Sequence, residues 1–163
     1  MMKVIKKLKI LTNHECKMKD KLILVVEDNP DHMELTVLTL QEHGVTAEIA
    51  VAHDGAEALD FLFGANAYAA RDRQKQPALI LLDMKLPKLS GLDVLRAVRA
   101  NPLTALVPVV MLTSSSEQSD ILACYQSGAN SFVRKPVDFL AFTEKLGRLQ
   151  AYWLDVNEPI SRD

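Results

Sequence analysis

The sequence has few cysteines, no long hydrophobic run and little net charge. Its two cysteines, Cys16 and Cys124, lie far apart in a chain of 163 residues, so we expect no disulfide framework, and a reducing cytoplasm fits better. No apolar stretch is long enough to cross a bilayer. The first residues lack the continuous apolar core and the small-residue cleavage site of a signal peptide. We therefore predict a cytoplasmic protein without a membrane partner.

The charge pattern argues against a nucleic-acid partner, and the spacing of the histidines argues against a zinc site. The formal net charge is −2 with both signs mixed along the chain, whereas proteins that bind nucleic acids usually carry a basic patch. We predict no nucleic-acid partner. The four histidines show no metal-ligand spacing with the cysteines, so we expect no zinc site.

The length suits one domain, and a hydrophobic content of 48% is enough for a packed core. We expect a flexible tail over residues 1–20, a single domain over 21–156 and a short tail over 157–163. Lysines alternate loosely with apolar residues in the first segment. A basic amphipathic helix on a membrane surface is therefore an alternative there, as is a natural start at Met18.

From Lys21 onward the pattern alternates strands with helices. The strands are expected over residues 22–26, 48–52, 79–82, 107–112 and 131–134, and the helices over about 30–43, 56–63, 91–100, 116–127 and from 137 onward. Strands that are apolar at every position are typical of a parallel sheet covered on both faces. We predict an α/β fold with three layers, a flavodoxin-like (β/α)5 doubly wound parallel sheet with strand order 2-1-3-4-5.

Three local features accompany this pattern. The spacing of Ser114 and Glu117 is that of a capping box and predicts the start of the fourth helix. The polar segment 64–77 is long for such a connection; it carries partner contacts or is a tolerated surface insertion. In the last helix, apolar residues repeat at three-four spacing over more turns than the sheet needs, which predicts either a self-association face or simple capping of the core: Phe139, Phe142, Leu146, Leu149, Trp153 and Val156.

Three carboxylates follow the first and third predicted strands. Glu27 and Asp28 end one apolar run, and Asp83 ends the other. Neighbouring parallel strands place their carboxyl ends at one sheet edge, where such folds bind ligands. Like charges at this range either raise a pKa or bind a cation between them. A hard divalent ion, most plausibly Mg²⁺, is the simplest solution.

Two more clusters are expected at the same edge. Thr113-Ser114 ends the fourth strand, and Lys135-Pro136 follows the fifth. Each cluster alone has an ordinary explanation as turn, cap or surface residues. Their occurrence together at four strand ends indicates a functional site.

This constellation resembles the receiver domain of two-component response regulators over roughly residues 21–153. Four segments carry the resemblance: Leu24-Val25-Val26-Glu27-Asp28-Asn29, Leu81-Leu82-Asp83-Met84-Lys85-Leu86-Pro87, Val109-Val110-Met111-Leu112-Thr113-Ser114 and Gly128-Ala129-Asn130-Ser131-Phe132-Val133-Arg134-Lys135-Pro136. The long segment before the third strand, Asn101-Pro102 and the ending Tyr152-Trp153-Leu154-Asp155-Val156 look more narrowly like the stand-alone regulators of bacterial and cyanobacterial phytochrome kinases.

The resemblance implies a role for each site residue. Asp83 would accept a phosphoryl group from the phosphohistidine of a sensor kinase, and Mg²⁺ would be held by Glu27, Asp28, Asp83 and the backbone carbonyl of Lys85, with water between Glu27 and the ion as an alternative. Lys135 would contact the phosphoryl oxygens, and its bond to Pro136 is a candidate cis peptide. Thr113 would read the modification, and Phe132 would rotate inward in response.

The implied protein is not an enzyme beyond its own self-catalysed phosphorylation and dephosphorylation. Its expected partners are a sensor histidine kinase, of phytochrome type on the narrower resemblance, and a second copy bound through the fourth helix, fifth strand, fifth helix and the C-terminal segment. One alternative is a pseudo-receiver that acts without phosphorylation. A phosphohydrolase of the haloacid dehalogenase type is less favoured, because Lys85 stands where that class needs a second aspartate. A flavin site is disfavoured by the acidic strand ends, since a flavin phosphate needs N–H donors.

Overall fold

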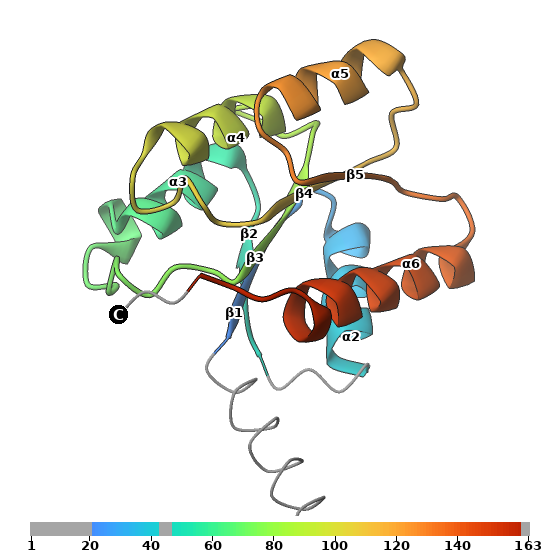
Figure 1. Cartoon of the computed structure of the whole chain (residues 1–163), viewed down its shortest axis with the longest axis horizontal. Helices are drawn as coiled ribbons and strands as arrows, with labels where there is room; N and C mark the ends of the chain where they lie inside the picture. Colours follow the sequence, from blue (N-terminus) through green and yellow to red (C-terminus); the bar gives the residue numbers. More distant parts are fainter. Residues whose placement is uncertain (1–20, 43–46, 161–163) are drawn as a thin grey trace, which may run out of the picture.

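The chain builds one parallel sheet of five strands, with helices on both of its faces (Figure 1). The computed structural model describes residues 21–42 and 47–160. The strands are β1 (Leu22–Val26), β2 (Glu48–Ala52), β3 (Leu79–Asp83), β4 (Val109–Thr113) and β5 (Ser131–Arg134), and the α-helices are α2 (Pro30–Glu42), α3 (Gly55–Phe63), α4 (Gly91–Ala100), α5 (Gln118–Gln126) and α6 (Phe139–Ala151). The strand order is β2-β1-β3-β4-β5, so the predicted fold class and topology are confirmed. Residues 1–20 and the predicted helix end at His43 lie outside the described residues.

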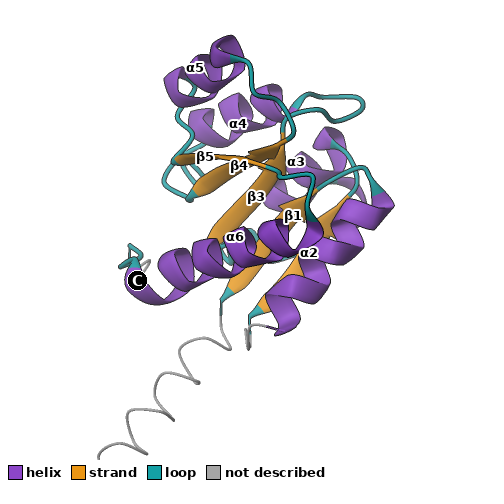
Figure 2. Cartoon of the chain, turned by 90° about the vertical axis from the view of Figure 1, so that its right-hand side faces the viewer, coloured by secondary structure: helices purple, strands orange, loops and turns teal. Residues whose placement is uncertain are grey.

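The central strands alternate their side chains between two cores. In β1, Leu24 packs with the core under α3, α4 and α5, whereas its neighbours Ile23 and Val25 pack with the core under α2 and α6. Figure 2 shows these two helical layers on opposite sides of the sheet. Every residue of β1 is buried, because both faces are covered, and this explains why the run is apolar throughout.

Side chains cap the starts of α2 and α4. Ser90 caps α4, where its hydroxyl accepts from the backbone N–H of Asp93 and the Asp93 carboxylate accepts in return. The α2 helix begins at Pro30, and the Asn29 side chain accepts from the backbone N–H groups of Asp31 and His32, both at 3.0 Å. Proline suits the first helical position because the missing donor would have no partner there.

The predicted capping box of α5 is wrong. Glu117 is the N-cap residue without a side-chain capping bond, and Ser114 is exposed. The adjacent Ser115 instead holds the turn that leads into the helix: its hydroxyl accepts from Glu117 N at 3.2 Å and donates to Asp120 Oδ2 at 2.5 Å. Three serines in a row, Ser114 to Ser116, made the spacing ambiguous, and the path of the chain out of β4 decides which of them contacts Glu117.

The apolar stripe of the last helix is partly wrong as well. Phe142 and Leu146 are buried as expected, but Phe139 and Val156 are exposed, whereas Leu154, which lies off the predicted stripe, is 3% exposed. A π-helical turn over Tyr152–Val156 follows α6 and shifts the phase of the side chains. The Leu154 carbonyl accepts from the amine of Lys21, which anchors this turn beside the start of β1.

The segment between α3 and β3 is not irregular throughout. It contains a short 3-10 helix over Asn66–Tyr68 and packs back on α3. The Tyr68 ring meets the Phe61 ring edge-on with 5.3 Å between centroids, and the Arg71 guanidinium lies 4.0 Å from the Phe61 centroid. The segment therefore packs against α3 at Phe61. Across residues 21–42 and 47–160, no helix is both long enough and apolar enough to pass through a membrane.

Candidate functional site

The first two carboxylates lie where the chain leaves β1. Glu27 extends the strand, since its backbone N–H donates to the Ala52 carbonyl at 3.1 Å. Its side chain is buried, and Oε1 accepts from Asn29 N at 3.0 Å. Asp28 is exposed. One carboxylate is therefore fixed in the protein while its neighbour faces solvent.

Asp83 is the last residue of β3, and its side chain is fixed at the start of the next loop. Asp83 Oδ1 accepts from Lys85 N at 3.0 Å. The loop closes tightly, because Gly91 N donates to the Met84 carbonyl at 2.9 Å. A Cβ on Gly91 would come within 2.0 Å of the Asp83 carbonyl oxygen, so any larger residue there would displace Asp83.

Lys135 comes from the loop after β5 and joins two of the carboxylates. Its amine lies 2.6 Å from Asp83 Oδ2 and also forms an ion pair with Glu27 Oε2. The Lys135 side chain is only 8% exposed. A lysine buried this deeply needs anionic partners, and here it has two.

The site remains negatively charged after this pairing. One carboxylate oxygen from each of Glu27, Asp28 and Asp83 lies within 4.8 Å of the others, and one amine cannot neutralise all three. Burial raises the pKa of the Glu27 carboxyl above its ordinary value; Lys135 opposes this rise, and the nearby Asp83 adds to it. Three carboxylates around one point are the donor set that a hard divalent cation prefers, so the residues present fit Mg²⁺.

Thr113 lies at the end of β4 beside this cluster and is fully buried. Its hydroxyl oxygen accepts from Ser115 N at 3.1 Å, and its carbonyl accepts from Lys135 N at 2.8 Å. The residue therefore connects the loop that leads into α5 with the loop that carries the lysine. Movement of the Thr113 hydroxyl would release the Ser115 amide.

Two predicted site residues lie differently from the carboxylates. Phe132 is half-buried in β5 and packs against the core under α3, α4 and α5, and its backbone N–H donates to the Tyr125 hydroxyl at 3.3 Å. Lys85 is exposed, and its backbone N–H contacts Asp83. The expectation of a cis bond between Lys135 and Pro136 is wrong, because every peptide bond among the described residues is trans.

A further ion pair near the site was not predicted from the sequence. Lys88, in the loop after Asp83, lies 2.5 Å from Asp54 Oδ2 at the start of α3. Asp54 also caps that helix by accepting from Glu57 N at 2.8 Å. No spacing rule links Asp54 to a lysine so far along the chain.

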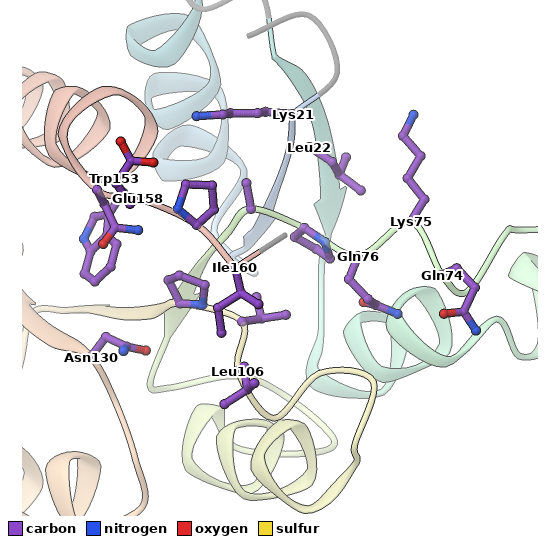
Figure 3. A pocket seen from close by; sticks show the side chains of 16 residues that line it. Lys21, Leu22, Gln74, Lys75, Gln76, Leu106, Asn130, Trp153, Glu158 and Ile160 are labelled. Carbon is purple, nitrogen blue, oxygen red and sulfur yellow. The ribbon is translucent and has the colours of Figure 1, made fainter. Parts of the chain in front are cut away.

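A cavity of about 450 Å³ was also missed, and it lies at the other end of the strands. Figure 3 shows Lys21, Gln76, Asn130, Trp153 and Ile160 around it. These residues precede β1, β3 and β5 or follow α6. Open parallel sheets bind their ligands at the carboxyl ends of the strands, so this cavity is separate from the carboxylate site.

The fold is a doubly wound parallel sheet, and a lysine amine forms ion pairs with two carboxylates at the strand ends. This combination defines a class of signalling domain. The chain belongs to the response regulator receiver domain family, whose model matches residues 23–146. It is a receiver-domain response regulator of two-component systems.

Three relatives locate the chain within this family. It is 33% identical over 136 residues to the probable methanogenesis regulatory protein FilR2 of Methanothrix harundinacea, covering 83% of this chain and 85% of that protein. It is 31% identical over 135 residues to the response regulator Rcp1 of Synechocystis, covering 83% and 90%. The structure of the phosphorylated cyanobacterial phytochrome response regulator RcpA matches with a TM-score of 0.81 at 30% identity, over 86% of this chain and 99% of that one.

Proposed function

We propose that this chain is a single-domain regulator that carries a phosphoryl group on Asp83 and changes its interaction surface in response. The observation that carries the proposal is the Lys135 amine, which contacts Asp83 and Glu27 inside a cluster of three carboxylates. A phosphoryl group on Asp83 would bring further negative charge to this cluster. The amine lies within hydrogen-bond distance of the acceptor oxygen and offers positive charge to that group.

The metal proposed for the site is Mg²⁺. Glu27, Asp28 and Asp83 would hold it, together with the backbone carbonyl of Lys85. When bound, Mg²⁺ supplies the positive charge that phosphoryl transfer to a carboxylate requires. A Mn²⁺-bound form is known for Rcp1, with which this chain shares 30% identity and a TM-score of 0.80, and this supports a divalent ion here.

The proposed transfer is a direct displacement at phosphorus. A carboxylate oxygen of Asp83 forms the new P–O bond while the P–N bond to the histidine of a sensor kinase breaks, and the imidazole nitrogen takes the bonding pair. Lys85 N, which donates to Asp83 Oδ1, holds one oxygen in place. The chain would thus be an acceptor, with catalysis limited to its own phosphorylation and dephosphorylation.

The response would begin at Thr113. Its hydroxyl oxygen accepts from the Ser115 amide in this structure, and a phosphoryl oxygen on Asp83 would give the hydroxyl an acceptor toward which it could turn as a donor. Release of the Ser115 amide would loosen the loop before α5, and Phe132 would then turn inward from its half-buried position. The change would thereby reach the face formed by α5, β5 and α6.

The partners that we propose are a phytochrome-type sensor histidine kinase and a second copy of this chain. We propose no nucleic-acid or membrane partner, and we propose a cytoplasmic location. RcpA, the relative named above, supports the type of kinase. Exposed apolar side chains support the second copy: Leu122 and Tyr125 on α5 are 58% and 50% exposed, and Tyr152 and Val156 after α6 are 50% and 65% exposed.

The dimer can be tested by analytical ultracentrifugation, which should show dimers of the wild-type chain and weaker dimerisation of Tyr125→Glu. Leu38→Glu is the control, since Leu38 is 48% exposed on α2, outside this face.

The decisive experiment is incubation with acetyl phosphate and Mg²⁺, followed by intact-mass measurement. The wild-type chain should gain the mass of one phosphoryl group, and Asp83→Asn should gain none, because it keeps the shape of the side chain but not the nucleophile. Asp72→Asn, a change on the exposed segment before β3, should behave as wild type. Absence of any gain in the wild-type chain would instead favour a pseudo-receiver.

A further inference from the structure

The loop after Asp83 contains a strained turn at Lys88. The backbone φ of Lys88 is 64°, and Leu89 N donates to the Pro87 carbonyl at 2.8 Å across it. A three-residue turn with positive φ at its centre is rare and strained for any residue except glycine. Such a conformation persists only where its surroundings hold it.

Two contacts from the start of α3 hold this turn. The Lys88 amine forms its ion pair with Asp54, and Gly55 packs directly on Leu89: a Cβ on Gly55 would lie 2.4 Å from the Leu89 carbonyl oxygen. Asp54 itself is fixed as the helix cap, and its side chain is only 13% exposed. The acceptor for the lysine is thus held in place by its cap bond to α3.

The same loop carries the part of the site that is made of backbone. Lys85 N contacts Asp83 Oδ1 at 3.0 Å. The base of the loop is closed by the bond between Gly91 N and the Met84 carbonyl. With the base closed and the tip pinned, the Lys85 peptide between them has little freedom.

We propose that Lys88 is a positioning residue for the metal site, acting through its ion pair with Asp54 on the backbone of Lys85. The inference rests on the proposed function, because it takes the Lys85 carbonyl to be a ligand of the divalent ion. Loss of the pair would let the strained turn relax and the carbonyl move, so the ion would bind more weakly. Lys88 is 66% exposed, and exposed ion pairs have modest effects. The expected change is therefore about threefold in the dissociation constant.

The test measures Mn²⁺ binding to the full chain by electron paramagnetic resonance, with thermal unfolding recorded on the same samples. Lys88→Met and Asp54→Asn should each weaken binding about threefold, and the double variant should be no weaker than either, because both remove one interaction. Asparagine keeps the helix cap. Lys88→Arg, which keeps the positive charge, should bind Mn²⁺ with the affinity of the wild-type chain. Lys75→Met is the matched control: it removes an exposed pair with Glu48 far from the loop and should leave binding unchanged.

Lys88→Gly separates the ion pair from the strain of the turn. Glycine accepts the positive φ without strain, so the turn has less tendency to relax when the pair is lost, and binding should weaken less than in Lys88→Met. Equal Mn²⁺ affinity in the wild-type chain, Lys88→Met and Asp54→Asn would refute the positioning role alone. A wild-type chain that binds no Mn²⁺ would instead refute the proposed metal site, and this inference with it.

Discussion

The amine of Lys135 lies 2.6 Å from Asp83 Oδ2, although 52 positions separate the two residues in the chain. The same amine also pairs with Glu27. Removal of the amine would leave two largely buried carboxylates without a cation, and breaking a buried pair in this way is strongly destabilising.

Lys135→Met should therefore lower the free energy of unfolding by about 3 kcal/mol in the presence of a chelator. Saturating Mg²⁺ should recover part of this loss, because the ion supplies the missing positive charge. Urea unfolding with and without Mg²⁺ measures both quantities. Lys145→Met, whose amine contacts only the Arg134 carbonyl among the described groups, should change little. A loss that Mg²⁺ leaves untouched would contradict this account.

Asp28 is expected to lower the stability of the fold, whereas Lys135 raises it. Asp28 is exposed, lies close to Glu27 and Asp83, and has no ion-pair partner within the described part of the chain. Asp28→Asn should raise the free energy of unfolding by about 0.5 kcal/mol without divalent ions, since it removes like-charge repulsion. The variant should also gain less stability from Mg²⁺ than the wild-type chain. Glu34→Gln, on the exposed side of α2, is the control that should show neither effect.

Ser115 is expected to stabilise the turn that leads into α5. Its hydroxyl accepts from Glu117 N and donates to Asp120, so Ser115→Ala should cost about 1 kcal/mol in urea unfolding. Ser114→Ala should cost less than about 0.5 kcal/mol, because Ser114 is exposed. The reverse order would support the cap that the sequence pattern predicts.

The π-helical turn can be tested at two apolar residues. Leu154→Ala should lower the free energy of unfolding by about 3 kcal/mol, because Leu154 is 3% exposed. Val156→Ala should cost less than about 0.5 kcal/mol, since Val156 is 65% exposed. Equal losses at the two positions would indicate a regular α-helix through this region.

Asp54 should make stability depend on pH. The hydrogen bond from Lys88 holds the pKa of the Asp54 carboxyl below its ordinary value of 3.8, and the Glu57 amide adds to this. A depressed carboxyl pKa stabilises the fold above the unfolded-state pKa, and that stability is lost as the pH falls through the folded-state pKa. The difference in unfolding free energy between wild type and Asp54→Asn should thus be largest near neutral pH and shrink below about pH 4. A difference that is constant from pH 7 to pH 3 would exclude this pair as its source.

The fold was predictable because its main signal is local. β1 and residues Leu79 to Leu82 of β3 are apolar and buried, and neighbouring parallel strands have their carboxyl ends at the same edge of the sheet. The clustering of Glu27, Asp28 and Asp83 follows from these two facts alone. The sequence pattern needed no knowledge of side-chain contacts to predict it.

Other features depend on packing that no local pattern records. The pair between Asp54 and Lys88 joins loops that are 34 positions apart, and it requires α3 to dock on the loop after β3. The burial of Leu154 depends on a change of helical phase, and a periodicity that assumes a regular α-helix cannot detect such a change. The contact of Ser115, and not of Ser114, with Glu117 depends on the direction in which the chain leaves β4.

The outer edge of β5 has a consequence for how molecules can meet. β5 is the last strand on its side of the sheet, and such edges can pair with a strand from a neighbouring molecule. The outward N–H of Phe132 is taken by the Tyr125 hydroxyl, and the outward carbonyl of Arg134 by the Lys145 amine at 3.2 Å. Backbone pairing across this edge would have to displace both side chains first. Two copies that approach here therefore touch through side chains, and open-ended growth of a shared sheet is disfavoured.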